Sequence, residues 1–190
     1  WVERGIDVLV AEINHDRRKA LKSQFPSISF IELENGKYNV EGHVVVLAVK
    51  PQIWPLLKFS GTAKAVITIM AGIKINTVKK NLASGVYIRA IPNVGAFYGK
   101  SATAVTGDPS FKTQALDVMR AIGQAWWVKS EHDIDIATAM IGSAPAWLAL
   151  VAEALADAGV KAGLQRPVST KFVQGVFESV ATLLKHNHPA

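Results

Sequence analysis

Cysteine is absent from the 190 residues of this chain. Its absence excludes a disulfide framework and any zinc site built on thiolates. A chain without disulfides suits a reducing compartment, so we expect a cytoplasmic protein. The histidines do not have the spacing of metal ligands, and we therefore expect no metal site. They are His15, His43, His132, His186 and His188.

Concentrated charge is also lacking. The formal net charge is +6, but the densest basic run is only Arg17-Arg18-Lys19. A nucleic-acid surface would need a longer basic stripe with interleaved aromatic residues, so we expect no nucleic-acid partner. A moderately basic enzyme with an anionic cofactor fits this balance at least as well. No uninterrupted apolar run reaches the roughly 20 residues of a membrane span, and we expect no membrane contact.

Strand and helix patterns alternate over residues 1–129. Apolar runs predict strands at 6–13, 28–31, 43–49, 65–70, 86–91, 101–106 and 126–128. Helical segments are expected at 17–25, 53–59, 76–82 and 109–122, the first of them capped by Asp16. Such alternation predicts βαβ crossovers, and hence an α/β domain with a doubly wound parallel sheet.

Residues that allow a ligand to approach the backbone follow several of these strands. Lys50-Pro51 follows the run at 43–49, Ala71-Gly72 the run at 65–70, and Pro92-Asn93 the run at 86–91. Asn14 ends the first strand in the same way. Ligands of doubly wound sheets bind outside the carboxyl ends of the strands, which favours a nucleotide-type ligand here. The alternative is that these residues only serve turns.

The pattern becomes helical from Ser130 onward, so we place a domain boundary there, with residues 1–129 before it and 130–190 after it. The run 146–158 is apolar except for Glu153 and Asp157, and Gly159 ends it. A helix apolar on most sides must be buried, and we expect it to pack against a partner subunit. At this length it is too short to span a membrane. The Gly142-Ser143 start suits either a ligand at free N–H groups or a tight helix crossing.

Several ordered motifs make the chain similar to the pyrroline-5-carboxylate reductase family over almost its whole length. The family's L-A-V-K-P-Q segment stands at 47–52, its A-A-G-[IV] turn at 70–73 and its R-x-M-P-N-T-P segment at 89–95. Its G-S-G-P-A-Y signature stands at 142–147, and its A-L-A-D-A-G-V-K-x-G-L run is unbroken at 154–164. Ordered matches with plausible spacing are more specific than any one of them.

The resemblance implies reduction of the imine 1-pyrroline-5-carboxylate to L-proline, with hydride from NADPH or NADH. It also implies a Rossmann-like dinucleotide-binding domain, here without its first strand, followed by an all-α dimerisation domain. The protein would be a homodimer or a higher oligomer built from dimers. The sequence has no convincing nucleophile–base pair, which suits an already electrophilic iminium carbon, because positioning then carries most of the catalysis.

Site residues follow from the resemblance. Asn14 and Asn35 would lie beside the adenosine, and Arg17 would meet a 2′-phosphate, unless it is an ordinary solvated charge. The pyrophosphate–nicotinamide path would be lined by Ala48, Val49, Lys50 and Pro51, and the nicotinamide end by Ala71, Gly72, Pro92 and Asn93. The catalytic candidates at the substrate cleft are Ser143 and Thr138, although helix packing is the alternative role for Thr138.

The resemblance is incomplete at both ends of the sequence. The family's first strand and its G-x-G-x-x-[GA] turn are not found before Ile6, and its S-P-G-G-x-T loop is not found before Ala190. We therefore expect a fragment, or further residues before Trp1, and no activity from residues 1–190 alone.

Substitutions inside the signature keep other functions open. Ala144 stands for a Gly, Trp147 for a Tyr and Ile141 for the usual Ser. A divergent paralogue could act on another imine or a hydroxy acid, or could be a non-catalytic dimeric nucleotide-binding protein. The choice between NADPH and NADH also stays open.

Overall fold

The structure is a computed structural model that describes residues 1–2 and 5–186. The chain divides into two compact units, Trp1–Gly142 and Ser143–Ala190. The first unit contains the strands and the shorter helices, and the second contains two long helices. This sheet-and-helix unit followed by a helical unit agrees with the expected fold class.

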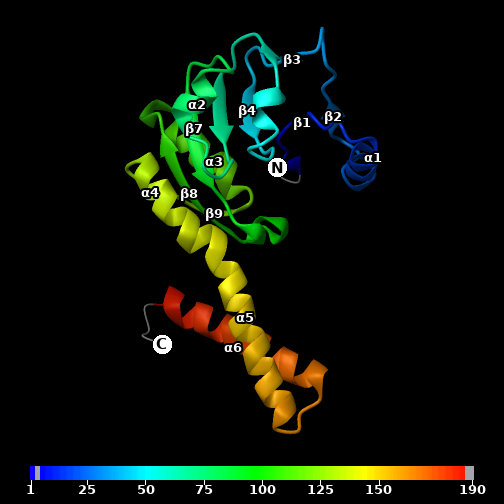
Figure 1. The fold of residues 1–190 in the computed structure, drawn as a ribbon, viewed down its shortest axis with the longest axis vertical. Helices are drawn as coiled ribbons and strands as arrows, with labels where there is room; N and C mark the ends of the chain where they lie inside the picture. Colours follow the sequence, from blue (N-terminus) through cyan, green and yellow to red (C-terminus); the bar gives the residue numbers. More distant parts are fainter. Residues whose placement is uncertain (3–4, 187–190) are drawn as a thin grey trace. The chain divides into compact units, whose positions relative to one another are not determined.

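A five-stranded sheet in the order β4-β6-β7-β8-β9 forms the first unit (Figure 1). Strands β4, β6 and β7 are parallel, β8 runs antiparallel to β7, and β9 is parallel to β8. The expectation of an all-parallel sheet is therefore wrong at β8, because the connection from β7 is too short for a crossover. The strands are β4 (Val44–Leu47), β6 (Ala65–Thr68), β7 (Tyr87–Ile91), β8 (Ser101–Gly107) and β9 (Gly123–Trp127).

Apolar cores lie on both faces of this sheet. One contains Ile67, Ile88 and Met119, and the other contains Val66 and Leu82. Neighbouring residues of a strand point to opposite faces, so Val66 and Ile67 place these cores on opposite sides. Helix α2 (Ile75–Lys79) packs on β7, α3 (Lys112–Arg120) on β8 and β9, and α4 (Glu131–Ala137) on β7 and β8. The arrangement is that of a doubly wound sheet.

Two short parallel strand pairs lie outside the main sheet. One joins β1 (Leu9–Val10) to β2 (Ser29–Phe30), and the other joins β3 (Tyr38–Asn39) to β5 (Phe59–Ser60). The strand expected over 6–13 is reduced to Leu9–Val10. Among the described residues, this strand pairs with β2 alone. The pair β3–β5 was not expected. It takes Phe59 from the predicted helix at 53–59, of which only a 3₁₀ turn at Trp54–Leu56 remains.

Helix α1 (His15–Gln24) begins two residues earlier than the expected start at residue 17. Its cap is Asn14, whose side-chain Oδ1 accepts a hydrogen bond from the Arg17 backbone N–H at 2.9 Å. The prediction that Asp16 caps the helix is therefore wrong. Asp16 lies in the first turn instead, where its negative charge favours the helix dipole.

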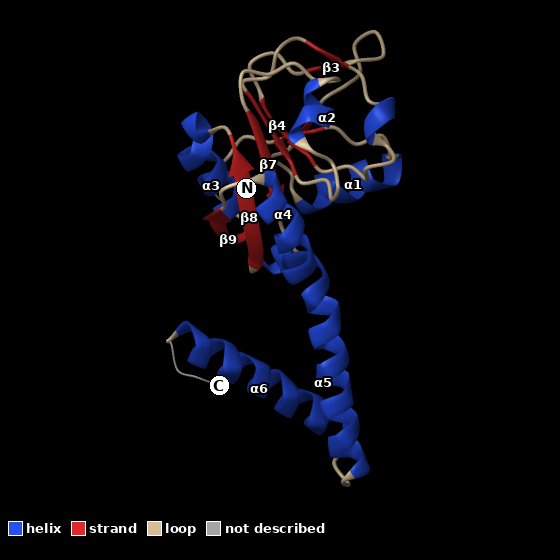
Figure 2. Ribbon diagram, turned by 60° about the vertical axis from the view of Figure 1, so that its left-hand side comes forward, coloured by secondary structure: helices blue, strands red, loops and turns tan. Residues whose placement is uncertain are grey.

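The second unit is a hairpin of α5 (Ala144–Lys161) and α6 (Arg166–Lys185), which diverge from their connecting turn (Figure 2). Close to that turn, the buried Ser169 hydroxyl donates to the Ala156 carbonyl at 2.7 Å. A methyl group added at Gly159 would collide with the same hydroxyl. The helices therefore cross closely at Gly159 because that residue has no side chain.

A six-residue π-helical segment, Thr138–Ser143, joins α4 to α5 in one helical run from Glu131 to Lys161. Pro145 lies in the first turn of α5, where proline is tolerated without ending the helix. By length and composition this run is apolar enough to cross a membrane, so the expectation that the helix is too short is wrong. The domain boundary at Ser130 stays a prediction.

Candidate active site

Three predicted segments lie at one edge of the sheet. Strands β4, β6 and β7 are neighbours and parallel, so the segments that follow their carboxyl ends share that edge. Residues 48–51 follow β4, Ala71 and Gly72 lie in the turn after β6, and Pro92 and Asn93 follow β7. The structure thus brings together most of the predicted cofactor-binding residues.

The turn after β6 offers its backbone to solvent. Ala71 and Gly72 are exposed. Gly72 has φ +75°, a conformation that side chains disfavour, and no atom lies within 4 Å of the position of a Cβ there. Glycine is needed at this position for the backbone conformation and also leaves room for a bound group.

The loop after β7 is held by its own hydrogen bonds. The Asn93 side-chain oxygen accepts from the Gly95 N–H at 3.1 Å, and the Asn93 backbone N–H donates to the Ser101 hydroxyl at 3.0 Å. A Cβ at Gly95 would approach the Lys100 carbonyl oxygen to 2.7 Å. Because the cap uses the amide oxygen, the amide NH₂ group of Asn93 can still donate to a ligand.

Arg89 lies beneath this edge and is only 1% exposed. Its guanidinium donates to Asp135 Oδ1 at 2.7 Å and contacts Glu131 Oε1 at 3.4 Å. The hydrogen bond from Arg89 holds the pKa of the Asp135 carboxyl below its usual value. Arg89 belongs to the motif at 89–95, but its contact with these carboxylates was not predicted from the sequence. Two features of the sequence point to this contact: Arg89 is a lone charge in an apolar strand, and Glu131 and Asp135 are four residues apart, on one side of a helix.

Near β1, the structure distinguishes Arg17 from its neighbour Arg18. The Arg18 guanidinium pairs with Glu32 and lies 4.7 Å from the centre of the Phe30 ring. The Arg17 side chain is 75% exposed, and its nearest carboxylate oxygen, from Glu12, is 3.8 Å away. Arg17 is therefore the better placed of the two to meet a phosphate group.

Asn35 occupies a tight turn. Asn35 and Gly36 both have positive φ, 52° and 72°, and Glu34 and Lys37 exchange backbone hydrogen bonds of 2.9 and 3.0 Å. An Asn-Gly pair is the usual solution for such a turn. The turn accounts for Asn35 by itself, and a contact with adenosine stays a prediction.

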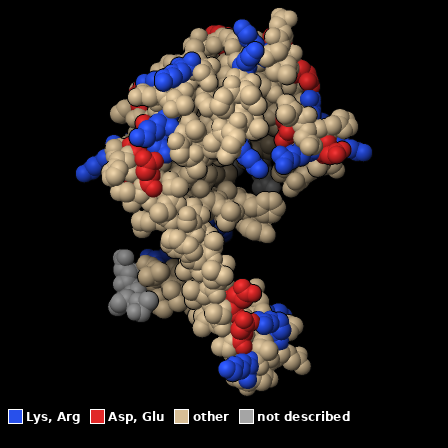
Figure 3. All heavy atoms as spheres, viewed as in Figure 1, with Lys and Arg blue, Asp and Glu red and all other residues tan. Residues whose placement is uncertain are grey.

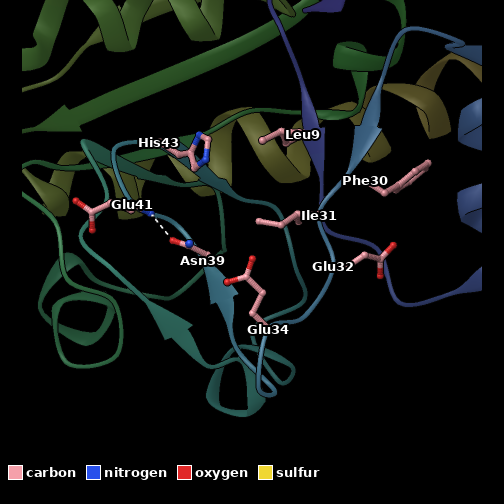
Figure 4. Close-up of a pocket in the computed structure, with 8 residues that line it drawn as sticks. All are labelled: Leu9, Phe30, Ile31, Glu32, Glu34, Asn39, Glu41 and His43. Atoms are coloured by element: carbon pink, nitrogen blue, oxygen red, sulfur yellow. Dashed lines mark hydrogen bonds between the residues drawn. The ribbon is translucent and has the colours of Figure 1, made fainter.

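A hollow near β1 contains none of the predicted site residues. Figure 4 shows Leu9, Ile31 and His43 around it together with three glutamates. Carboxylates repel phosphate groups, so we assign no nucleotide to it. Its lining consists of Leu9, Phe30, Ile31, Glu32, Glu34, Asn39, Glu41 and His43.

The two catalytic candidates lie in the π-helical segment. Thr138 Oγ1 donates to the Ile134 carbonyl at 2.8 Å, which leaves its oxygen free only as an acceptor. Ser143 is exposed and makes no side-chain capping bond to α5. Ser143 is therefore the freer donor, and the catalytic role of either residue stays a prediction.

Charge on the face drawn in Figure 3 is dispersed, with several blue Lys and Arg side chains beside red Asp and Glu. Among the described residues, no cluster of His, Cys, Asp and Glu could hold a metal ion. The expected lack of a nucleic-acid partner stays a prediction.

The edge formed by the carboxyl ends of β4, β6 and β7 is best suited to a ligand bound through backbone groups and a few polar side chains.

Comparison with known proteins agrees with these motifs. Residues 131–190 match the family model described as pyrroline-5-carboxylate reductase dimerisation. The chain is 37% identical over 153 residues to the pyrroline-5-carboxylate reductase of Thermus thermophilus, covering 77% of this chain and 58% of that protein. It is 32% identical to the enzyme of that name from Corynebacterium melassecola, covering 94% of this chain and 70% of the relative.

Solved structures give the same result. The 1-pyrroline-5-carboxylate reductase of Streptococcus pyogenes matches with a TM-score of 0.80 at 25% identity, covering 97% of this chain and 72% of that one. The Plasmodium falciparum pyrroline carboxylate reductase with NADP bound matches with a TM-score of 0.69 at 28% identity, covering 86% and 65%. The chain therefore spans 58% to 72% of the length of these relatives.

Proposed function

The chain belongs to the pyrroline-5-carboxylate reductase family, and from this premise we propose that the protein reduces 1-pyrroline-5-carboxylate to L-proline with NADPH or NADH. The observation that carries the proposal is the shared edge of β4, β6 and β7. The segments at this edge are also those that resemble the family's motifs. An exposed Gly72 turn and a braced Asn93 loop suit a ligand that lies against the backbone.

The reaction asks for little acid–base chemistry from the protein. The nicotinamide, when bound, supplies a hydride to the imine carbon. The C=N double bond becomes a single bond, and the ring nitrogen carries the added proton. Protein groups then need only to orient the ring and stabilise its charges. Asn93 has a free amide donor for a substrate carboxylate, and exposed Lys50 provides a positive charge.

For the cofactor we propose NADPH in preference to NADH. Arg17 extends from the first turn of α1, where the helix dipole also favours an anion. A 2′-phosphate carries the added negative charge that an exposed guanidinium binds in a bidentate manner. Glu12 lies 3.8 Å from Arg17 and would have to release it, which makes Arg17 a specificity residue rather than a permanent ion pair.

We also propose a homodimer, or a higher oligomer built from dimers, in the cytoplasm. Within the described chain, α5 buries only Ala156, while Trp147 is 61% exposed. The family model that covers this region is named for dimerisation. A second copy would cover the exposed apolar residues of α5 and α6, including Leu150, Phe172 and Leu184.

Steady-state oxidation of NADPH and of NADH by the purified intact gene product, with and without pyrroline-5-carboxylate, tests the function. Turnover that depends on the imine is expected. Arg17→Ala should raise the KM for NADPH and leave that for NADH unchanged. Lys19→Ala, on the same helix and also exposed, is the matched control and should change neither.

A folded protein that binds NADPH but does not oxidise it with this imine would contradict the proposal. A panel of other imines and hydroxy acids would then separate the two alternatives. Turnover with one of them would indicate a changed substrate, and nucleotide binding without any turnover would indicate a non-catalytic relative.

A further inference from the structure

The buried Arg89 connects three segments of the first unit. It lies on β7, and its guanidinium contacts Glu131 and Asp135 on α4, 42 and 46 residues further along the chain. Glu131 Oε1 also accepts from the backbone N–H of Ile75, the first residue of α2, at 2.9 Å. One guanidinium and one carboxylate therefore join β7, α4 and the start of α2.

Each of these segments leads into a part of the candidate site. Pro92 and Asn93 directly follow β7, the strand that contains Arg89. The exposed Gly72 turn lies just before Ile75. Thr138 follows Asp135 on the same helical run. The contacts of Arg89 and Glu131 thus link β7, which leads into the Asn93 loop, to Ile75, which follows the Gly72 turn.

Stability alone does not account for a buried arginine at this position. Apolar side chains of similar volume commonly replace buried ion pairs without loss of stability. A guanidinium differs from them because its planar donors fix the direction of two partners at once. The carboxylate of Glu131 adds a third fixed direction through the Ile75 N–H.

We propose that Arg89 is a positioning residue for the reductase reaction, holding the Gly72 turn and the Asn93 loop at a fixed separation through Glu131 and Asp135. This inference rests on the proposed function, since it concerns the same site. It assigns Arg89 no contact with substrate or cofactor. Its effect passes through the backbone of the two loops.

The test compares Arg89→Met and Arg89→Lys with wild type in the whole protein. Hydrogen exchange of segments 71–76 and 91–95 is expected to quicken in Arg89→Met, while exchange in β8 stays unchanged. The kcat with pyrroline-5-carboxylate should fall by about 10- to 100-fold, because a displacement of about 1 Å at the reacting groups can cost about 100-fold. The KM for NADPH should change much less, and Arg89→Lys should restore part of the kcat.

Two further variants keep the result interpretable. Arg120→Met removes an exposed ion pair with Asp117 and should affect neither measurement. Glu131→Ala keeps Arg89 but removes the acceptor of the Ile75 N–H, so exchange at Ile75 should quicken even if Arg89→Met does not fold. Unchanged loop exchange and unchanged kcat in folded Arg89→Met would overturn the inference. If wild type has no imine turnover, the proposed function fails, and exchange alone decides the positioning role.

Discussion

The close crossing of α5 and α6 gives a prediction that the structure quantifies. Gly159→Ala places a methyl group against the Ser169 hydroxyl, with Ser169 Cβ at 3.2 Å and Leu164 Cδ1 at 3.4 Å. Ser169 is 2% exposed and cannot move into solvent. If its side chain rotates, its hydrogen bond to the Ala156 carbonyl is lost.

Three free-energy contributions of differing sign determine how much Gly159→Ala changes the stability of the protein. Alanine in place of glycine favours a helix by about 1 kcal/mol. Overpacking a buried contact costs about 1–3 kcal/mol, and an unpaired buried hydroxyl costs about 1–3 kcal/mol more. We therefore expect Gly159→Ala to lower the free energy of unfolding by about 1–5 kcal/mol. The double variant Gly159→Ala/Ser169→Ala also removes the Ser169 hydroxyl and should recover most of the lost free energy of unfolding.

Urea unfolding of the whole protein measures these changes, at fixed protein concentration because an oligomer's stability depends on it. Gly175→Ala on α6 is the matched control, since a Cβ there meets no atom within 4 Å. It should stabilise the protein by up to about 1 kcal/mol. If Gly159→Ala stabilises the protein as Gly175→Ala does, the helices do not cross as described.

Three other predictions follow from local contacts. Trp54→Phe should change the unfolding free energy by less than about 1 kcal/mol, because Nε1 is buried without a partner among the described residues and removing it offsets the lost ring area. Asn35→Ala should cost about 1 kcal/mol by urea unfolding, because alanine disfavours positive φ. The hydrogen bond from Arg89 lowers the pKa of Asp135. The ionised carboxylate therefore stabilises the protein above the usual carboxyl pKa, and this stabilisation is lost as the pH falls through the lowered pKa. Asp135→Asn should weaken the pH dependence of the unfolding midpoint over that range of pH.

The main sheet was readable from the sequence because its strands are apolar runs with clear ends. The run expected at 86–91 is β7 at Tyr87–Ile91, and that at 101–106 is β8 at Ser101–Gly107. Strand direction was misjudged at β8. The signal was present, because the connection between these strands is shorter than the dozen or more residues that a parallel crossover needs.

Features set by distant contacts were harder to find. The strands β3 and β5 have two residues each and show no periodicity, so only their pairing defines them. The cap of α1 is a local feature, and the sequence left a choice between two neighbouring capping residues: the Asn14 side chain, rather than that of Asp16, accepts from the Arg17 N–H. The burial of Arg89 depends on partners more than 40 residues away, which no local pattern reveals.

The exposed apolar side chains of α5 are understood only when the sequence and the structure are considered together. The apolar sequence of α5 predicts a buried helix, yet Trp147 and Leu150 are exposed among the described residues, and this is the reason for proposing a second copy over them. Lipid would have to accommodate Glu153 and Asp157 on the same helix, and Asp157 pairs with Arg166 at the start of α6. Charged groups are costly in a bilayer, whereas the edge of a protein interface leaves them hydrated. The proposed second copy therefore accounts for these exposed apolar residues better than a membrane does.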